Sequence, residues 1–123
     1  MRKSRSSCPV ACALDLIGDR WTLLVVRDLL FGAHYFDDFK KSPEGIATNI
    51  LGQRLRFLHE HGFVSRTADE ADGRRVRYAL TERGKSLEPV MMAVARWGAE
   101  HVEGAKMPPL PAKSRARGTR KKA

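Results

Sequence analysis

The sequence predicts a mainly α-helical fold that carries one small β-hairpin (α+β). Several segments before residue 62, and another over 81–101, repeat apolar residues near a helical period. Two short runs, 63–68 and 76–80, alternate apolar and polar residues around a polar loop that contains Asp72-Gly73, a hairpin signal. A polar-faced helix followed at once by a basic-tipped hairpin is the pattern of a winged helix-turn-helix. Its helix enters the major groove of DNA, and its hairpin, the wing, rests on the neighbouring backbone or minor groove.

The first two helices are predicted from their end signals and apolar spacing. Pro9 can occupy the first position of a helix that runs to about Ile17, because its missing N–H is not needed there. Asp19 should cap a second helix over residues 20–31. This segment is apolar on nearly every side and is therefore expected to be the central core helix, ending at Gly32.

The fold is organised around a helix within residues 45–62. A short extended piece at 34–36, a candidate third strand beside the hairpin, and a short helix at 37–41 should precede it. Thr48 can cap the organising helix, and Gly62 stands where a left-handed C-terminal residue is expected. One stripe can be buried because its apolar residues recur near a 3.6-residue period. They are Ile50, Leu51, Leu55 and Leu58.

The opposite side of this helix carries side chains of the kinds that read base edges or grip phosphates. They are Thr48, Asn49, Gln53, Arg54 and Arg56. Gln53 can bridge an adenine and Arg54 can fork onto a guanine, so these two are the best candidates for contact with double-stranded DNA. The alternative is an ordinary solvated face, on which Arg56 pairs with Glu60 four residues later.

Three arginines lie at the tip and on the second strand of the predicted hairpin. They are Arg74, Arg75 and Arg77. In a wing, arginines at these places contact phosphates or enter the minor groove. The alternative is that they are solvated loop charges, paired with the acidic residues of the same loop at 69–72.

The predicted last helix has more apolar surface than one packed face needs. Thr81 should cap a single helix that runs to about His101, and Pro89, which removes one backbone donor, is the expected place for a kink. One of its two apolar rows contains Val90, Val94, Trp97 and His101. The surplus favours a second subunit, that is, a homodimer. The alternative is a deep groove within the monomer that covers both rows.

The positive charge of the chain is concentrated at its two ends. The total is 23 basic and 14 acidic residues, a net charge of +9. Residues 1–7 and 105–123 contain 10 of the basic residues and no acidic ones, so that 8–104 has 13 basic and 14 acidic residues. We expect one domain over 8–104 between two disordered basic tails that bind nucleic acid without specificity. No apolar stretch is long enough for a membrane span or a secretory signal, which predicts a cytoplasmic, nucleoid-associated protein.

A set of short motifs follows in unbroken order across residues 8–104. They are Cys8-Pro9-Val10, Ile17-Gly18-Asp19-Arg20-Trp21, Leu29-Leu30-Phe31-Gly32, Gly45-Ile46, Gln53-Arg54-Leu55, Arg75-Val76-Arg77-Tyr78 and Leu80-Thr81-Glu82-Arg83-Gly84. Through this ordered set the chain resembles the HxlR-type winged-helix regulators of bacteria. The resemblance implies a dimeric transcription regulator, repressor or activator, that binds an operator with two half-sites. It also implies that the first and last helices form the dimer interface, which adds Val10 and Leu14 to it.

Cys8 is a candidate sensor of oxidants or electrophiles. It stands at a helix N-terminus, where the helix dipole favours the thiolate, and Arg2, Lys3 and Arg5 add positive potential. The resemblance implies the same role, because some members sense quinones, aldehydes or oxidants through a cysteine at this position. The alternative is an inert thiol that helps to orient the chain. Cys12, one turn later, is expected to be a small core or interface residue.

No pattern in the sequence points to catalysis. The four histidines have no metal-ligand spacing, and no nucleophile–base pair or glycine-rich phosphate loop is present, so we expect no enzyme, metal or cofactor. The predicted function is that of a dimeric, sequence-specific DNA-binding regulator with an unknown inducer. The alternative is a winged-helix protein-interaction module whose basic tail binds nucleic acid nonspecifically.

Overall fold

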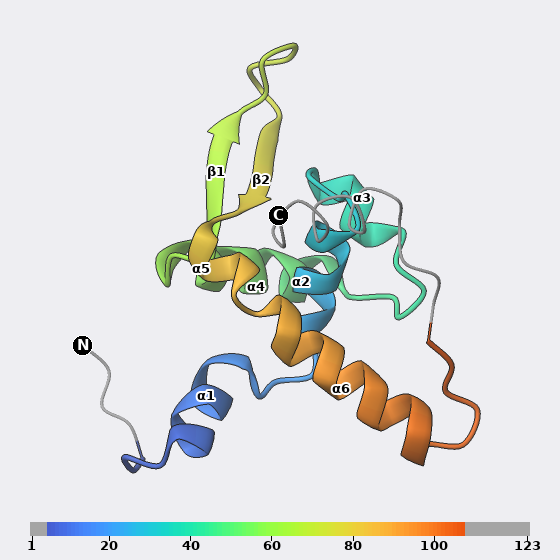
Figure 1. The fold of residues 1–123 in the computed structure, drawn as a ribbon. Helices are drawn as coiled ribbons and strands as arrows, with labels where there is room; N and C mark the ends of the chain where they lie inside the picture. Colours follow the sequence, from blue (N-terminus) through green and yellow to red (C-terminus); the bar gives the residue numbers. More distant parts are fainter. Residues whose placement is uncertain (1–4, 108–123) are drawn as a thin grey trace, which may run out of the picture.

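The predicted mainly α-helical architecture with one hairpin is confirmed. The computed structural model describes residues 5–107, so most of both predicted tails lies outside the described residues. The elements are α1 (Pro9–Ile17), α2 (Thr22–Leu30), α3 (Phe36–Lys40), α4 (Thr48–Glu60), β1 (Val64–Ala68), β2 (Val76–Leu80), α5 (Glu82–Lys85) and α6 (Glu88–His101). The strands form an antiparallel pair in which Val64 lies opposite Leu80 and Ala68 opposite Val76. Figure 1 shows the hairpin standing out from one side of the helical body, with α1 and α6 on the other side.

The core lies between α2, α4 and the base of the hairpin. As predicted, α2 is the central helix, since most of its apolar side chains are buried. On α4 the buried residues are Leu51, Leu55 and Leu58, as the periodicity predicted, whereas Ile50 is only partly buried. Phe39 of α3 packs edge-on against Tyr78 of β2, which joins the small helix to the sheet. Gly62 has a φ of 80°, the left-handed conformation that was expected at the end of α4.

Two predicted helix starts are wrong. The second helix begins at Thr22 instead of residue 20, although the Asp19 carboxylate does accept the backbone N–H groups of Trp21 and Thr22, both at 3.0 Å. Thr48 does not cap α4, because Ala47 occupies the cap position and Thr48 is already helical. The Thr48 hydroxyl instead accepts a hydrogen bond from Lys40 Nζ at 2.7 Å.

The predicted single last helix is two helices, α5 and α6. Thr81 caps α5, since its hydroxyl accepts the Gly84 N–H at 3.1 Å, as predicted. The chain then breaks at residues 86–87 instead of bending at Pro89, which lies in the first turn of α6. In a continuous helix Pro89 could not donate to the carbonyl of Lys85 and its ring would clash with it, which explains the interruption.

The predicted third strand at 34–36 is also wrong. Phe36 is already the first residue of α3, and the sheet contains only β1 and β2 among the described residues. One pairing of the expected kind remains, because the Tyr78 N–H donates to the His34 carbonyl at 2.7 Å. In addition, His34 Nδ1 lies 2.8 Å from the Tyr78 carbonyl oxygen. His34 therefore contacts β2 at both the N–H and the carbonyl of Tyr78, where a third strand was expected.

Because α5 lies very close to the chain at the start of β1, one added methyl group on α5 should lower the stability of the fold. A Cβ atom at Gly84 would lie 2.1 Å from the Phe63 carbonyl oxygen, so Gly84→Ala should lower the free energy of unfolding by about 1–3 kcal/mol. The matched control is Gly52→Ala, because a Cβ at Gly52 meets nothing within 4 Å and alanine in a helix interior is favoured by about 1 kcal/mol. Urea unfolding of both variants is the measurement; equal stabilities would contradict the packing described here.

Candidate nucleic-acid interface

One face of α4 is free of contacts with the core. Leu51, Leu55 and Leu58 define the inner face, and at 100° per residue Asn49, Gln53 and Arg56 fall on the opposite side. All three are exposed, as is Thr48 at the start of the helix. The structure therefore places an amide pair and one guanidinium group together on the outer face of α4, which can present hydrogen-bond donors and acceptors to base edges.

Arg54 does not belong to this outer face. Its side chain is only 24% exposed, and its Nη1 lies 3.4 Å from Asp19 Oδ1. The guanidinium group also lies over the ring of Phe57, 4.8 Å from its centroid. Burial raises the pKa of Asp19, but hydrogen bonds from Thr22 and Trp21 and the charge of Arg54 outweigh it, so the pKa is lowered. As placed here, Arg54 joins α4 to the start of α2, a role that sequence reasoning missed.

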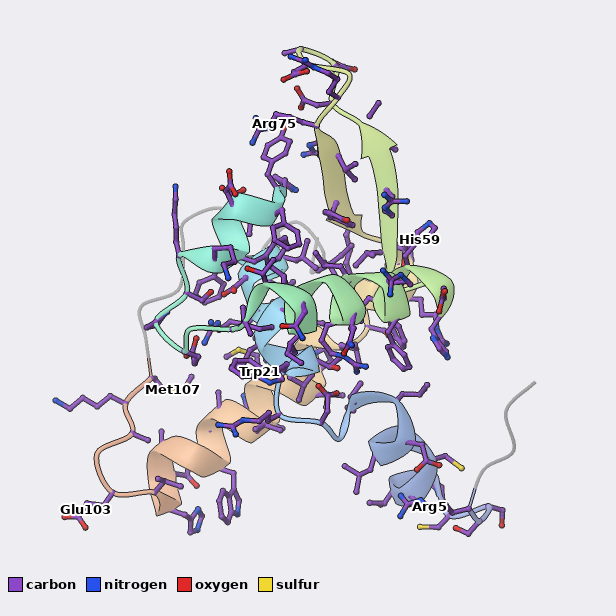
Figure 2. The ribbon with its side chains drawn as sticks, turned by 180° about the vertical axis from the view of Figure 1, so that it is seen from behind. Arg5, Trp21, His59, Arg75, Glu103 and Met107 are labelled. Atoms are coloured by element: carbon purple, nitrogen blue, oxygen red, sulfur yellow. The ribbon has the colours of Figure 1, made fainter. Side chains whose placement is uncertain are left out.

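The three hairpin arginines have different surroundings. Arg74 is 95% exposed, with one long contact of 3.7 Å to Asp72. Arg75 lies over the ring of Tyr35, 3.7 Å from its centroid, on the side of the hairpin that faces α3 (Figure 2). Arg77 on β2 is half-buried. Arg74 is therefore the freest of the three, and the alternative considered above, pairing with a loop carboxylate, is seen for its side chain only as this long contact.

Tyr35 fastens the wing to the helical body. Its hydroxyl donates a hydrogen bond to the Asp69 carboxylate, and this bond raises the pKa of Tyr35 and lowers that of Asp69. Asp69 also accepts the backbone N–H groups of Ala71 and Asp72 at 3.1 and 3.0 Å, so it organises the loop as well. Sequence reasoning missed Tyr35, because its partner is 34 residues away.

A groove runs between α4 and the hairpin on the same side as the outer face of α4. Its volume is about 380 Å³. It is lined by Gly52, Arg56, His59, Glu60, Arg66 and Tyr78. Figure 2 shows His59 where α4 meets β1. Arg66 lies over the Tyr78 ring at 5.9 Å, so this basic residue of the groove, which the sequence analysis did not single out, has a preferred position.

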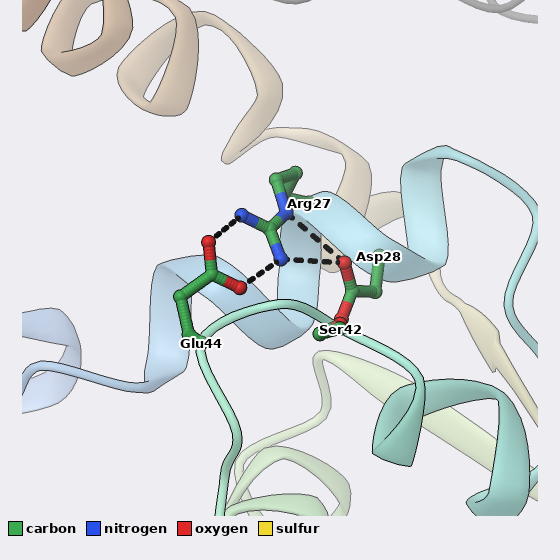
Figure 3. Close-up of polar contacts among 4 residues, drawn as sticks. All are labelled: Arg27, Asp28, Ser42 and Glu44. Carbon is green, nitrogen blue, oxygen red and sulfur yellow. Dashed lines mark hydrogen bonds and ion pairs between the residues drawn. The ribbon is translucent and has the colours of Figure 1, made fainter. Parts of the chain in front are cut away.

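The turn that leads into α4 is held from α2. The guanidinium group of Arg27 donates two hydrogen bonds of 2.8 Å to the Glu44 carboxylate, and Asp28 lies 2.9 Å from the same guanidinium group (Figure 3). Asp28 also accepts a hydrogen bond from the Ser42 hydroxyl. The bonds from Arg27 lower the pKa of Glu44. These four side chains fix residues 42–44 and hence the point from which α4 starts.

The apolar side chains predicted for a dimer interface are all on the surface. Val10 and Leu14 on α1 are exposed, as are Val90, Val94 and Trp97 on α6, where Trp97 is 60% exposed. His101 is exposed too, and its ring stacks on that of Trp97 at 4.7 Å. Neither α1 nor α6 contains a buried residue. Such a concentration of uncovered apolar side chains is typical of an interaction surface.

Cys8 is exposed and occupies the cap position of α1. Its backbone N–H donates to the Ser6 hydroxyl at 3.2 Å. Arg5, which was expected to add positive potential here, pairs instead with Asp15 at 2.8 Å, and Arg2 and Lys3 lie outside the described residues. Cys12 is half-buried, and its thiol donates to the Ser6 carbonyl at 3.3 Å.

Within residues 5–107, no group of histidine, cysteine, aspartate or glutamate side chains is arranged to hold a metal ion. None of the helices described in this part of the chain is long and apolar enough to cross a membrane.

Comparison with known proteins identifies the family. Residues 16–106 match the family model described as HxlR-like helix-turn-helix. The chain belongs to this family. Its curated relatives are transcriptional regulators, not enzymes; one of them, an uncharacterized HTH-type regulator of Mycobacterium tuberculosis, is 37% identical over 101 residues. The match covers 82% of this chain but 63% of that relative, so the chain spans less than two thirds of the relative's length.

Solved structures agree with this HxlR-like assignment. The crystal structure of PA1607, classed as a transcription factor, is 40% identical with a TM-score of 0.75, over 86% of this chain and 73% of that chain. The redox regulator HypR in its reduced form is 30% identical with a TM-score of 0.70, over 78% of this chain and 95% of that chain. The winged-helix fold and the transcription-regulator family are thereby established for this HxlR-like chain.

The Arg27–Glu44 pair predicts a pH dependence of stability. The pKa of Glu44 in the folded HxlR-like domain lies below its ordinary value of 4.5, so the pair contributes fully above that pH and is lost as the pH falls through the lower folded pKa. Glu44→Gln should therefore reduce the slope of unfolding free energy against pH below 4.5. Urea unfolding over a pH series is the measurement. Glu82→Gln, at an exposed glutamate 3.6 Å from Lys85, is the control; equal slopes in both variants would contradict the assignment.

Proposed function

We propose that this HxlR-like regulator binds double-stranded DNA sequence-specifically as a homodimer, and that α4 reads the major groove. The observation that carries the proposal is the groove between α4 and the hairpin, in which Arg56 and His59 of the helix face Arg66 of β1. With two arginines and one glutamate, Glu60, in its lining, the groove has a net positive charge, and its place between a helix and a wing suits a phosphate backbone that runs between a major-groove and a minor-groove contact. Since the charge of the domain as a whole is close to zero, such local clusters must supply its DNA affinity.

Within this proposal Gln53 and Asn49 read bases, and Arg56 contacts a base or phosphate. Both amides are exposed on the outer face of α4, and an amide side chain can form two hydrogen bonds with an adenine. Arg54 was a candidate of equal rank from sequence, but its contacts with Asp19 and Phe57 favour a positioning role. Arg74, Arg75 and Arg77 contact phosphates from the wing, while the basic tails add affinity that does not depend on sequence.

The homodimer is proposed from the uncovered apolar stripe on α1 and α6. Stripe here means Val10, Leu14, Val90, Val94, Trp97 and His101. Its helices, α1 and α6, lie on the side of the body away from the hairpin, so a partner bound there does not cover the wing (Figure 1). A two-fold dimer presents two copies of α4 to two half-sites, which is the arrangement that helix-turn-helix dimers use.

Loss of the Gln53 amide should reduce sequence discrimination. We expect Gln53→Ala to lower the preference for the operator over scrambled DNA by roughly 1–3 kcal/mol, the value of one good bidentate base contact. Arg74→Ala is the comparison, because a wing phosphate contact should weaken binding to both duplexes alike. Titration of both duplexes at one salt concentration measures the ratio; an unchanged ratio in Gln53→Ala would show that this face is not the reader.

A charge in the stripe should separate the subunits. Trp97→Glu puts a carboxylate in place of the most exposed large apolar side chain of α6, so it should give a monomer with much weaker operator binding. Arg96→Glu is the control, since Arg96 is exposed on the same helix but outside the stripe. Sedimentation equilibrium distinguishes the two outcomes. A Trp97→Glu protein that stays dimeric would remove α6 from the interface.

We propose further that Cys8 responds to oxidants or electrophiles, a role supported by its exposure at the start of α1 and by the likeness to the redox regulator HypR. Cys8 should react faster with iodoacetamide at neutral pH than half-buried Cys12. Cys8→Ser should abolish release of DNA by quinones, aldehydes or peroxide, whereas Cys12→Ser should keep it. Equal labelling rates, or release that persists in Cys8→Ser, would leave Cys8 a structural residue.

A further inference from the structure

A separate apolar pocket lies between α2 and α6. Its volume is about 440 Å³, within the range of roughly 300–1,000 Å³ that small-molecule sites occupy. Its walls come mainly from Leu23 and Leu24 of α2, from Phe31 directly after that helix, and from Met91, Met92 and Ala95 of α6. The turn before α4, through Pro43 and Glu44, and the end of the described chain close it on a third side. Figure 2 shows Met107 returning toward that turn after the chain leaves α6.

The pocket is distinct from both surfaces described above. None of its lining residues belongs to the outer face of α4 or to the hairpin. On α6, Met91, Met92 and Ala95 point roughly 140° around the helix axis from the stripe, and Val94 alone is shared between the two. A partner subunit that contacts the stripe therefore does not cover the face of α6 that lines the pocket.

The chemistry of the lining defines a class of ligand. Most of the wall is aliphatic or thioether, and methionines adapt to ligands of different shape. The polar groups are at the mouth, where the charge of Arg27 is already matched by Glu44. Lys106 also lines the mouth, and in the described part of the chain no carboxylate forms an ion pair with it. The unmatched charge at the mouth is therefore positive.

We propose that this pocket binds a small amphipathic anion, with an aromatic or aliphatic body and one carboxylate. We propose also that the bound anion lowers the affinity of the protein for DNA. The body lies against Leu24, Met91 and Ala95, and the carboxylate faces Lys106. The second half of the proposal rests on the DNA-binding function proposed above, whereas the ligand site itself does not.

The coupling runs through Glu44. This residue forms part of the pocket wall and, through its two bonds with Arg27, also fixes the turn from which α4 starts. A ligand in the pocket displaces the Glu44 side chain from the wall and hence from Arg27, which loosens that turn and changes the position of α4. Since such coupling is reciprocal, bound operator lowers the affinity for the ligand by the same factor.

Calorimetric titration of the full chain with 1-naphthoate tests the site, with 1-naphthalenemethanol as the uncharged probe of the same body. Ala95→Phe fills the pocket and should weaken naphthoate binding by about tenfold or more. Ala93→Phe adds the same ring to an exposed position of α6 outside the pocket and should bind as the parent does. Ala95→Leu, which adds less bulk, serves if Ala95→Phe does not fold by circular dichroism.

Two further variants test the charge. Lys106→Gln should weaken naphthoate binding by about twofold to fivefold, as expected for a partly exposed ion pair, and leave the alcohol unaffected. Lys85→Gln, a surface lysine that pairs with Glu82, is the control and should change neither. Failure of the parent to bind either probe, or naphthoate binding undiminished by the pocket-filling variant, would overturn the site. An equal effect of Lys106→Gln on both probes would overturn the anionic ligand class.

The coupling has its own readout. Saturating 1-naphthoate should weaken operator binding by the parent but not by Ala95→Phe. An unchanged operator affinity in a parent that binds naphthoate would overturn the coupling. A chain that binds naphthoate but fails to bind operator even without it would instead contradict the proposed function, so the two failures are distinguishable.

Discussion

The placement of α4 depends on one guanidinium group, that of Arg27. The side chain is 21% exposed, and it ties α2 to Glu44 by two parallel hydrogen bonds, a geometry that fixes direction as well as distance. Asp28, the next residue on α2, holds Ser42 in the same turn. Removing Arg27 would leave Asp28, whose side chain is 17% exposed, without its cationic partner, which costs more than losing an exposed pair. The outer face of α4 is therefore positioned from the central core helix.

The surfaces that surround this anchor face different directions. The groove between α4 and the hairpin lies on the wing side, where Tyr35 and Asp69 hold the loop, and the stripe of α1 and α6 lies on the other. Dimerisation and DNA reading, as proposed, therefore do not compete for the same residues. The apolar pocket between α2 and α6 is lined by residues of α6 and by the Arg27–Glu44 pair. A ligand bound there could therefore act on both α6 and the turn that precedes α4.

Local patterns in the sequence predicted most of the helices and the hairpin, because apolar spacing and end signals involve residues that are neighbours in the sequence. The buried row Leu51, Leu55 and Leu58 and the hairpin around Asp72-Gly73 are examples. Contacts between distant residues were not predictable in this way. Arg54 looked like a base reader until its partner Asp19, 35 positions earlier, was located, and Glu44 was assigned only to a turn. Pro89 was noticed, but the chain breaks before it, at residues 86–87, and the separate helix α5 lies against Phe63, a contact that spacing does not reveal.

The central claim is that two copies of α4, held in a dimer, read two half-sites on one face of DNA. Hydroxyl-radical footprinting on a duplex selected from random sequence tests it most directly. The account predicts two protected blocks on one face of the duplex, about 10–10.5 base pairs apart or a multiple of that spacing. Inserting about 5 base pairs between them should abolish joint protection, because it turns one half-site to the far side. A single protected block that survives the insertion would contradict the account.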